Sequence, residues 1–189
     1  MMRIITGRAR GIRLDTLEGD MTRPTTERAK EAIFSRLQFE IEGRRVLDLF
    51  AGSGQMGLEA VSRGAIHAVL VDQSKDAINI IRKNAERTRL ADDCTIVCSD
   101  FADYLRTRRG KDPFDLVFID PPYPMNACRA AVEAILENRL LKPHGILVLE
   151  SGVPDPLGVD TPLAGRFEVL RSARYGKAYV TILTPKKEN

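Results

Sequence analysis

Short apolar runs alternate with helical periodicity along most of the chain. Runs of four or five mostly apolar residues predict buried strands at residues 46–50, 68–71, 95–98, 116–119 and 146–149. Between them, apolar positions at helical spacing predict helices over residues 58–63, from a cap at Ser74 through Ala85, over 101–108 and over 127–140. Strands that alternate with helices in this way are typical of a parallel sheet covered by helices on both faces.

The N-terminal part of the chain departs from this repeat. Residues 3–14 mix short β-leaning runs with two glycines and predict a small hairpin or an extended arm. A helix is then expected to open after Pro24, with Thr25 or Thr26 as its N-cap. One face of this helix is apolar and the other is polar; the two sets are Ala29, Ile33, Phe34 and Leu37, and Arg28, Lys30 and Glu31.

The C-terminal part predicts an antiparallel closure of the sheet. Alternating runs at residues 167–173 and 178–183 flank a Tyr-Gly-Lys turn and are typical of a hairpin. Together these patterns predict an α/β protein with a Rossmann-like, doubly wound and mostly parallel seven-stranded sheet. We divide the chain into a basic N-terminal arm and helix, residues 1–42, and a main domain that holds the sheet, residues 43–189. In such sheets ligands bind at the carboxyl ends of the strands.

Composition and charge narrow the class of protein. The 189 residues are 43% hydrophobic and 29% charged, which is typical of a soluble globular domain. The formal net charge is +3, and all of this excess falls in residues 1–30, while the remaining residues balance. A basic arm on a neutral domain favours an RNA-binding appendage, with a solvated basic edge as the alternative.

Cysteines, histidines and apolar segments add mainly exclusions. Three cysteines without a C-x-x-C spacing indicate neither a disulfide framework nor a zinc site, so we expect buried, reduced thiols and no metal. His67 and His144 stand apart from any ligand pattern. No secretory signal and no apolar run long enough for a membrane span is found, so we expect a cytoplasmic protein without a membrane partner.

A glycine-rich segment follows the first predicted strand. Residues 48–57 read Asp-Leu-Phe-Ala-Gly-Ser-Gly-Gln-Met-Gly and contain G-x-G-x-x-G. Asp72 follows Gly52 by 20 residues and ends the second strand, where a carboxylate can bind ribose hydroxyls. The pattern predicts a nucleotide-like cofactor, and a nicotinamide would satisfy it too. The structural alternative is a tight turn in which Asp72 supports the helix that begins at Ser74.

The fourth predicted strand ends in Asp120-Pro121-Pro122-Tyr123. An exocyclic amine of a nucleobase is a poor nucleophile because its lone pair is delocalised into the ring. The Asp120 carboxylate and the Pro122 carbonyl can accept its two N–H bonds and direct the lone pair at a methyl donor, while Tyr123 stacks on the base. The prolines restrict φ and remove backbone donors. This cluster therefore favours methylation of an amine over hydride transfer.

These motifs resemble those of known methyltransferases. The cluster at residues 120–123 is similar to the amino-methyltransferase motif, and residues 48–54 look like the S-adenosylmethionine loop of class I methyltransferases. Further stretches resemble the RsmD family of bacterial 16S rRNA guanine-N2 methyltransferases over nearly the whole chain. They are Arg3-Ile4-Ile5 with Arg10-Gly11, Arg23-Pro24-Thr25-Thr26, and Gly57-Leu58-Glu59-Ala60 with Ser62-Arg63-Gly64.

The resemblance implies a site and a reaction. It implies a class I fold, S-adenosylmethionine as methyl donor, no metal, and transfer to N2 of a guanine in 16S rRNA, guanine 966 in the family's usual name. The implied cofactor residues are Asp48, Phe50, Ala51, Gly52, Ser53, Gly54, Asp72, Gln73, Asp100 and Phe101. A plain N-cap is the alternative role for Asp100. Family members often have an aromatic residue at Ala9 and a small residue at Gln55, so this chain departs there.

Partners and rival functions follow from the same residues. We expect Arg8, Arg10, Arg13, Arg23 and Thr25 to contact RNA, and the partner to be 16S rRNA or an assembly intermediate of the small ribosomal subunit, bound by a monomer. The rivals are adenine-N6 or cytosine-N4 DNA methyltransferases, a protein glutamine methyltransferase, a nicotinamide-dependent oxidoreductase, and an RNA-binding module with a degenerate cofactor site. Because the sheet core takes up most of these residues, we expect no separate DNA target-recognition domain.

Overall fold

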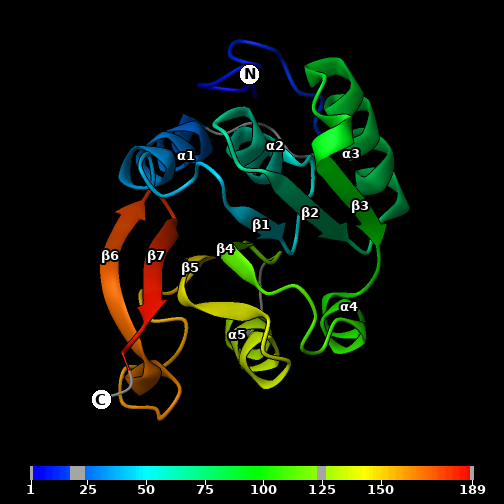
Figure 1. Ribbon diagram of the computed structural model, residues 1–189. Coiled ribbons are helices and arrows are strands. Elements are labelled where there is room, and N and C mark those ends of the chain that lie inside the picture. The colour runs from blue at the N-terminus through cyan, green and yellow to red at the C-terminus, as the bar shows by residue number, and fades with distance from the viewer. Residues whose placement is uncertain (1, 18–23, 123–126, 188–189) are drawn as a thin grey trace.

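The computed structural model describes residues 2–17, 24–122 and 127–187, and within them seven strands form one sheet in the order β3-β2-β1-β4-β5-β7-β6 (Figure 1). The strands are β1 Arg45–Asp48, β2 His67–Asp72, β3 Cys94–Cys98, β4 Phe114–Ile119, β5 Leu141–Ser151, β6 Phe167–Tyr175 and β7 Ala178–Pro185. β1 to β5 pair in parallel, whereas β7 lies antiparallel between β5 and β6. The strand order reverses between β1 and β4, so this point is where a ligand crevice is expected.

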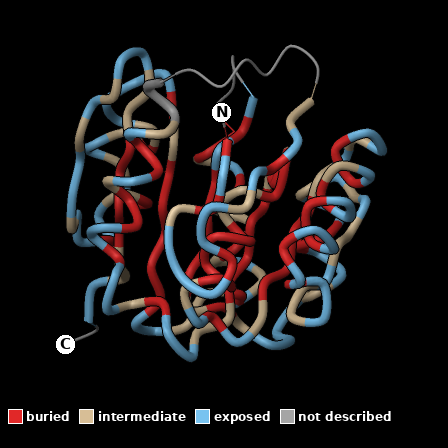
Figure 2. The backbone as a smooth tube through the Cα atoms, turned by 90° about the horizontal axis from the view of Figure 1, so that it is seen from above, coloured by how far each residue is buried: buried red, intermediate tan, exposed pale blue. Residues whose placement is uncertain are grey.

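Helices cover both faces of the sheet. They are α1 Pro24–Arg36, α2 Gln55–Ser62, α3 Lys75–Thr88, α4 Phe101–Thr107 and α5 Ala127–Glu137, with 3-10 turns η1 Ala91–Asp93 and η2 Ala164–Arg166. Side chains of α1, α2 and α3 pack in one hydrophobic cluster, and those of α4 and α5 in a second cluster on the other face. Figure 2 shows the buried positions along the strands and the inner sides of the helices. The predicted doubly wound α/β sheet is confirmed.

Residues 2–17 form the predicted small hairpin. Arg3 and Arg13 make an isolated antiparallel bridge, and the Ile4 amide donates a hydrogen bond to the Ile12 carbonyl (3.0 Å). The apolar side chains of this arm are buried in the same cluster as α1, α2 and α3. They are Met2, Ile4, Ala9 and Leu14. The arm is therefore held against α1, α2 and α3 by hydrophobic packing as well as by hydrogen bonds.

Two local expectations are wrong. α1 begins at Pro24 and not after an N-cap at Thr25 or Thr26; proline suits the first helical position because its missing N–H has no partner there. The cysteines are free, but Cys98 is exposed and Cys94 is half-buried, because β3 is the edge strand of the sheet; Cys128 alone among them is buried.

The described residues lack two further features. None of the helices there is long and apolar enough to cross a membrane. In the same ranges, no group of three or more His, Cys, Asp or Glu side chains is arranged to hold a metal ion.

Candidate active site

A glycine-rich loop connects β1 to α2 at the carboxyl edge of the sheet. Gly52 and Gly54 have φ angles of 54° and 79°, in the left-handed region that strains residues with a Cβ. A Cβ on Gly54 would also lie 3.1 Å from Leu70 and 3.2 Å from Ile81. A Cβ on Gly52 would meet no atom within 4 Å. The loop therefore turns sharply and borders open space at Gly52, where a ligand can approach the backbone.

Asp72, the last residue of β2, binds the backbone of this loop. Its Oδ2 accepts a hydrogen bond from the Gly52 amide (2.8 Å), and its Oδ1 accepts one from the Ser74 amide (2.8 Å). The supporting role predicted as the alternative for Asp72 is thus present. Each carboxylate oxygen has a second lone pair, so ligand hydroxyl groups can bind the same side chain.

Asp48 ends β1 and lies beneath the loop, only 3% exposed. Burial raises the pKa of its carboxyl to about 7; the Gly57 amide, which donates to Oδ2 (2.9 Å), opposes this rise, and the charge of Asp72 adds to it. Asp48 therefore links β1 to α2 through a buried hydrogen bond, and almost none of its surface is accessible to a ligand.

We expect Asp48→Asn to flatten the pH dependence of stability between about pH 4 and 7. Because the folded-state pKa is raised, the folded protein keeps a proton that the unfolded chain releases above pH 3.8, so stability falls as the pH rises through this window. Asparagine does not ionise and still accepts the Gly57 hydrogen bond. Urea unfolding should show that the wild type loses about 2–4 kcal/mol of its free energy of unfolding between pH 4 and pH 7.5. The variant should not show this loss. An equal loss in both proteins would contradict the raised pKa.

Two aromatic rings lie beside the loop. The ring centroids of Phe50, which follows β1, and Phe101, which begins α4, are 5.2 Å apart. Asp100 is the N-cap of α4, and its Oδ1 accepts a hydrogen bond from the Ala102 amide (2.8 Å), so the N-cap alternative is confirmed as its structural role. The Gln73 side chain is exposed. Half-buried rings and an exposed carboxylate at one strand edge suit a nucleoside base.

The arm and the loop are joined through α3. The Ser53 hydroxyl is buried and donates to the sulfur of Met2 (3.3 Å), and Ala51 is buried too, so both would reach a cofactor mainly through their backbone. Asn84 is fully buried, and its Nδ2 donates to the carbonyls of Ser53 (2.9 Å) and Asp15 (3.0 Å). The sequence analysis did not identify Asn84. Its position on the otherwise apolar face of α3 could have indicated a buried polar role.

The Asp-Pro-Pro cluster follows β4, which pairs in parallel with β1. Asp120 and Pro122 are exposed, and Pro121 is buried. Because neighbouring parallel strands end at the same edge, Asp120 lies beside the start of the glycine-rich loop. Tyr123 lies outside the described residues, so its role stays a prediction.

Side chains from four elements converge near Asp120 around a small cavity of about 20 Å³. This volume holds roughly one water molecule, so a base would bind at its opening. Besides Asp120, the polar lining residues are Lys30 from α1, Gln55 from α2 and Glu150 from β5. Sequence reasoning did not select Lys30 or Glu150. Glu150 directly follows the predicted fifth strand, and this position at the end of a strand could have indicated a site residue.

Lys30 is buried, and the prediction that it lies on the polar face of its helix is wrong. It is 2% exposed, and its Nζ lies 3.1 Å from Glu59 Oε2 and donates to the Arg3 carbonyl (2.9 Å). Burial lowers the pKa of Lys30, and the charge of Glu59 opposes this effect. The physical reason is helical geometry: Lys30 precedes Ile33 and Phe34 by one turn and so borders the apolar face.

Glu59 of α2 is fully buried and binds four groups. Its carboxylate accepts hydrogen bonds from the amides of Ile5 (2.7 Å) and Thr6 (3.0 Å) and from Arg63 Nε (2.7 Å), in addition to the ion pair with Lys30. We call these five residues the Glu59 network. It joins the arm, α1 and α2 on the side of the sheet where Lys30 reaches the cavity near Asp120.

The arginines predicted to contact RNA are partly described. Arg8, Arg10 and Arg13 are exposed on the arm, and Arg8 forms an ion pair with Asp93. Arg23 and the side chain of Thr25 lie outside the described residues. Of these three arginines, only Arg8 forms an ion pair with another described residue.

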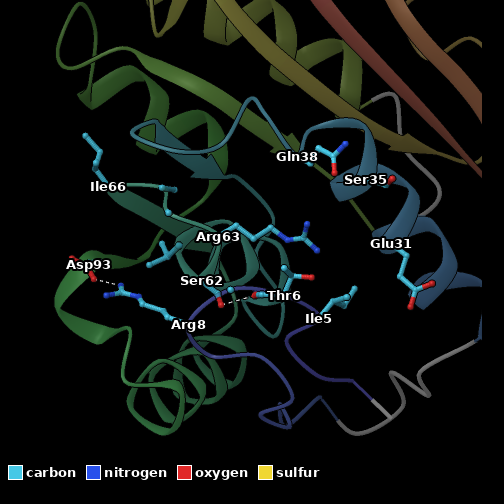
Figure 3. A pocket seen from close by; sticks show the side chains of 14 residues that line it. Ile5, Thr6, Arg8, Glu31, Ser35, Gln38, Ser62, Arg63, Ile66 and Asp93 are labelled. Carbon is cyan, nitrogen blue, oxygen red and sulfur yellow. Dashed lines mark hydrogen bonds and ion pairs between the residues drawn. The ribbon is translucent and has the colours of Figure 1, made fainter.

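A wider cavity of about 930 Å³ lies between the arm, α1 and the end of α2 (Figure 3). The arginine–aspartate pair of Arg8 and Asp93 borders it, and Ser62 Oγ donates to the Thr6 carbonyl at its wall (2.7 Å). Its residues 64–66 and Asp93 directly precede β2 and β3. The cavity therefore lies at the opposite edge of the sheet from the glycine-rich loop and is separate from the candidate active site.

The strand order, with β7 antiparallel between β5 and β6, defines the Rossmann-like fold of class I methyltransferases. A solved structure described as putative methyltransferase yhhF from Escherichia coli is similar, with a TM-score of 0.84 and 28% identity over 99% of both chains. The sequence model of the family Conserved hypothetical protein 95 matches residues 2–184. The chain belongs to this family, which is the RsmD methyltransferase family expected from the sequence.

Two relatives agree with this assignment. The chain is 34% identical to "Ribosomal RNA small subunit methyltransferase D" of Haemophilus influenzae, covering 82% of this chain and 81% of the relative. It is 36% identical to "Putative rRNA methyltransferase YlbH" of Bacillus subtilis, covering 79% of this chain and 82% of the relative.

Proposed function

We propose that this protein transfers a methyl group from S-adenosylmethionine to the exocyclic N2 of a guanine in 16S rRNA. The observation that carries the proposal is the position of Asp120 and Pro122 at the end of β4, beside the glycine-rich loop that follows β1. A pair of acceptors next to a cofactor loop suits an amine with two N–H bonds. The relatives' names support ribosomal RNA as the substrate.

The residues at the loop fit the cofactor. Open space at Gly52 allows close approach to the backbone, Asp72 has free lone pairs for ribose hydroxyls, and Phe50 and Phe101 offer an apolar surface for adenine, with Asp100 beside them. When bound, S-adenosylmethionine supplies an activated methyl group. The chain's own residues are expected to position this group and to keep it next to Asp120.

Asp120 and Pro122 act by orientation. The carboxylate of Asp120 and the Pro122 carbonyl accept the two N–H bonds of the amine, so its lone pair points toward the glycine-rich loop. A carboxylate near the nitrogen also stabilises the positive charge that develops there during methylation, and the nitrogen then loses one of its two protons, to Asp120 or to water. The base must be unpaired or extruded from its helix to reach this site, at a cost of a few kcal/mol.

The arm supplies the contact to RNA phosphates. Residues 1–42 serve as the RNA-binding appendage of the catalytic domain at 43–189, and the substrate is 16S rRNA or an assembly intermediate of the small subunit. We further propose that the protein acts as a monomer in the cytoplasm. Exposed arginines on the arm support this division.

We expect Arg10→Ala combined with Arg13→Ala to weaken RNA binding and to reduce its salt dependence. Each lost phosphate contact lowers the slope of log K against log salt by about one unit, because one fewer counterion is released. Filter binding of 16S rRNA between 50 and 200 mM salt measures the slope. Arg109→Ala with Lys111→Ala, also exposed, is the matched control. An unchanged slope in the arm variant would favour the solvated-edge interpretation.

Mapping of N2-methylguanosine in 16S rRNA tests the proposed function. In a strain from which this gene is deleted, one guanine should lack the modification, and the restored gene should return it. Restoration of the gene carrying Asp120→Ala should leave the guanine unmodified. If the deletion changes no guanine in 16S rRNA, the proposed substrate is wrong.

A further inference from the structure

Glu150 lies beside Asp120 at the carboxyl edge of the sheet. β4 and β5 pair in parallel with Phe118 opposite Val148 and Ile119 opposite Leu149, so the next positions in this register are Asp120 and Glu150. Side chains alternate along a strand, so both carboxylates project on the face of Phe118 and Val148, which α1 and α2 cover. Both residues line the small cavity.

The Glu150 carboxylate is held in place but has an unused capacity to accept hydrogen bonds. Its backbone carbonyl accepts a hydrogen bond from Cys128 Sγ (3.3 Å), and the residue pairs with Val180 in β7, so its backbone is fixed on both sides. Among the hydrogen bonds and ion pairs between described residues, none engages the carboxylate itself. Burial raises the pKa of Glu150, which means that its charged form has lost part of its hydration. A desolvated carboxylate binds an N–H donor more strongly than an exposed one.

Lys30 does not satisfy this carboxylate, although it lines the same cavity. Its Nζ is bound to Glu59 and to the Arg3 carbonyl. Two carboxylates from adjacent strands thus line the cavity, and the one cation among its described lining residues is already engaged. Such a surface favours a ligand edge with several neighbouring N–H donors.

Guanine has such an edge. Its N1–H and one N–H bond of N2 point in nearly the same direction, whereas adenine N1 and cytosine N3 are acceptors. We propose that Glu150 accepts the N1–H of the target guanine while Asp120 and the Pro122 carbonyl bind its N2 amine. This inference rests on the proposed function. Glu150 thereby determines base specificity, because an adenine or cytosine would place a lone pair against a carboxylate.

Substitution of the target guanine by 2-aminopurine tests this proposal. That base keeps the N2 amine but has an acceptor at N1. The substrate is RNA carrying the mapped guanine or 2-aminopurine, used as a fragment or as a reconstituted small-subunit particle, whichever the wild-type enzyme methylates with guanine. We expect the wild-type kcat/KM for guanine to exceed that for 2-aminopurine by at least about 100-fold, since a site built for an N–H rejects a base that lacks it.

Glu150→Gln should lower kcat/KM for guanine by about 10- to 100-fold and reduce the preference to less than about tenfold, because the glutamine amide can turn its N–H toward an acceptor at N1. Glu168→Gln, at an exposed carboxylate on β6, is the matched control and should keep both the rate and the preference. S-adenosylhomocysteine should bind Glu150→Gln as it binds the wild type, which shows that the variant is folded.

The outcomes separate this inference from the proposed function. A wild-type enzyme that methylates both bases equally overturns the role of Glu150 without any variant. An unchanged preference in Glu150→Gln overturns it as well, although the enzyme would remain a guanine methyltransferase. A wild-type enzyme that fails to methylate guanine in 16S rRNA in any form contradicts the proposed function itself, and the inference with it.

Discussion

Replacing Asp120 by alanine should lower methyl transfer to RNA by about 10³-fold or more while leaving the dissociation constant of S-adenosylhomocysteine within about threefold of the wild type. The reason is the position of this carboxylate, which follows β4 and lies beside the glycine-rich loop without being part of it. Without the carboxylate, the amine is neither oriented nor stabilised as positive charge develops on nitrogen. Single-turnover methylation and calorimetric titration measure the two effects separately.

Two further variants make this result specific. Asp120→Asn keeps one carbonyl acceptor, so it should retain more activity than Asp120→Ala. Asp92→Ala removes an exposed carboxylate at the opposite edge of the sheet and should have no effect on turnover. An active Asp120→Ala enzyme would exclude the assigned role, and weakened binding of S-adenosylhomocysteine alone would move Asp120 to the cofactor site.

Glu59→Gln should destabilise the protein by about 3–5 kcal/mol. Glu59 is fully buried and neutralises Lys30, which is itself 2% exposed. Glutamine has the same shape but no charge, and its one oxygen cannot serve all the donors that Glu59 accepts, so the Lys30 ammonium is left buried without a counter-ion. Urea unfolding at pH 7 measures the loss of stability.

The control for this prediction is an exposed ion pair of the same type. Glu133→Gln removes the partner of Arg129 on the surface of α5 and should cost less than about 1 kcal/mol, because solvent screens that pair. Adding Lys30→Met to Glu59→Gln should recover part of the lost stability, since no buried charge then remains uncompensated. Equal losses in Glu59→Gln and Glu133→Gln would show that the Glu59 network contributes no more than a surface pair.

The main elements and the candidate site were predictable because they depend on local order. Short apolar runs predicted the strands, and in parallel sheets the residue after a strand lies at the ligand edge, which placed Asp72 and Asp120 correctly. The left-handed φ angles of Gly52 and Gly54 agree with the turn expected from the glycine spacing. Capping of α3 by Ser74 likewise follows from its neighbours in the chain.

The buried polar residues were not predictable in the same way. Lys30 and Glu59 lie 29 positions apart, and each alone has the character of a surface residue. Their burial follows from the packing of α1 against α2, which a helical pattern does not specify. The role of Asn84 likewise depends on the arm, and that of Glu150 depends on the register of β4 and β5.

The sequence by itself determined the order of strands and helices, the glycine-rich turn and the strand-end carboxylates, because each depends on residues within a few positions of one another. Only the tertiary structure decided which charged side chains are buried, how the arm is tied to the loop, and which second carboxylate faces Asp120. The physical reason is that burial and pairing arise from contacts between distant segments, and their free energy depends on the environment that those segments create together.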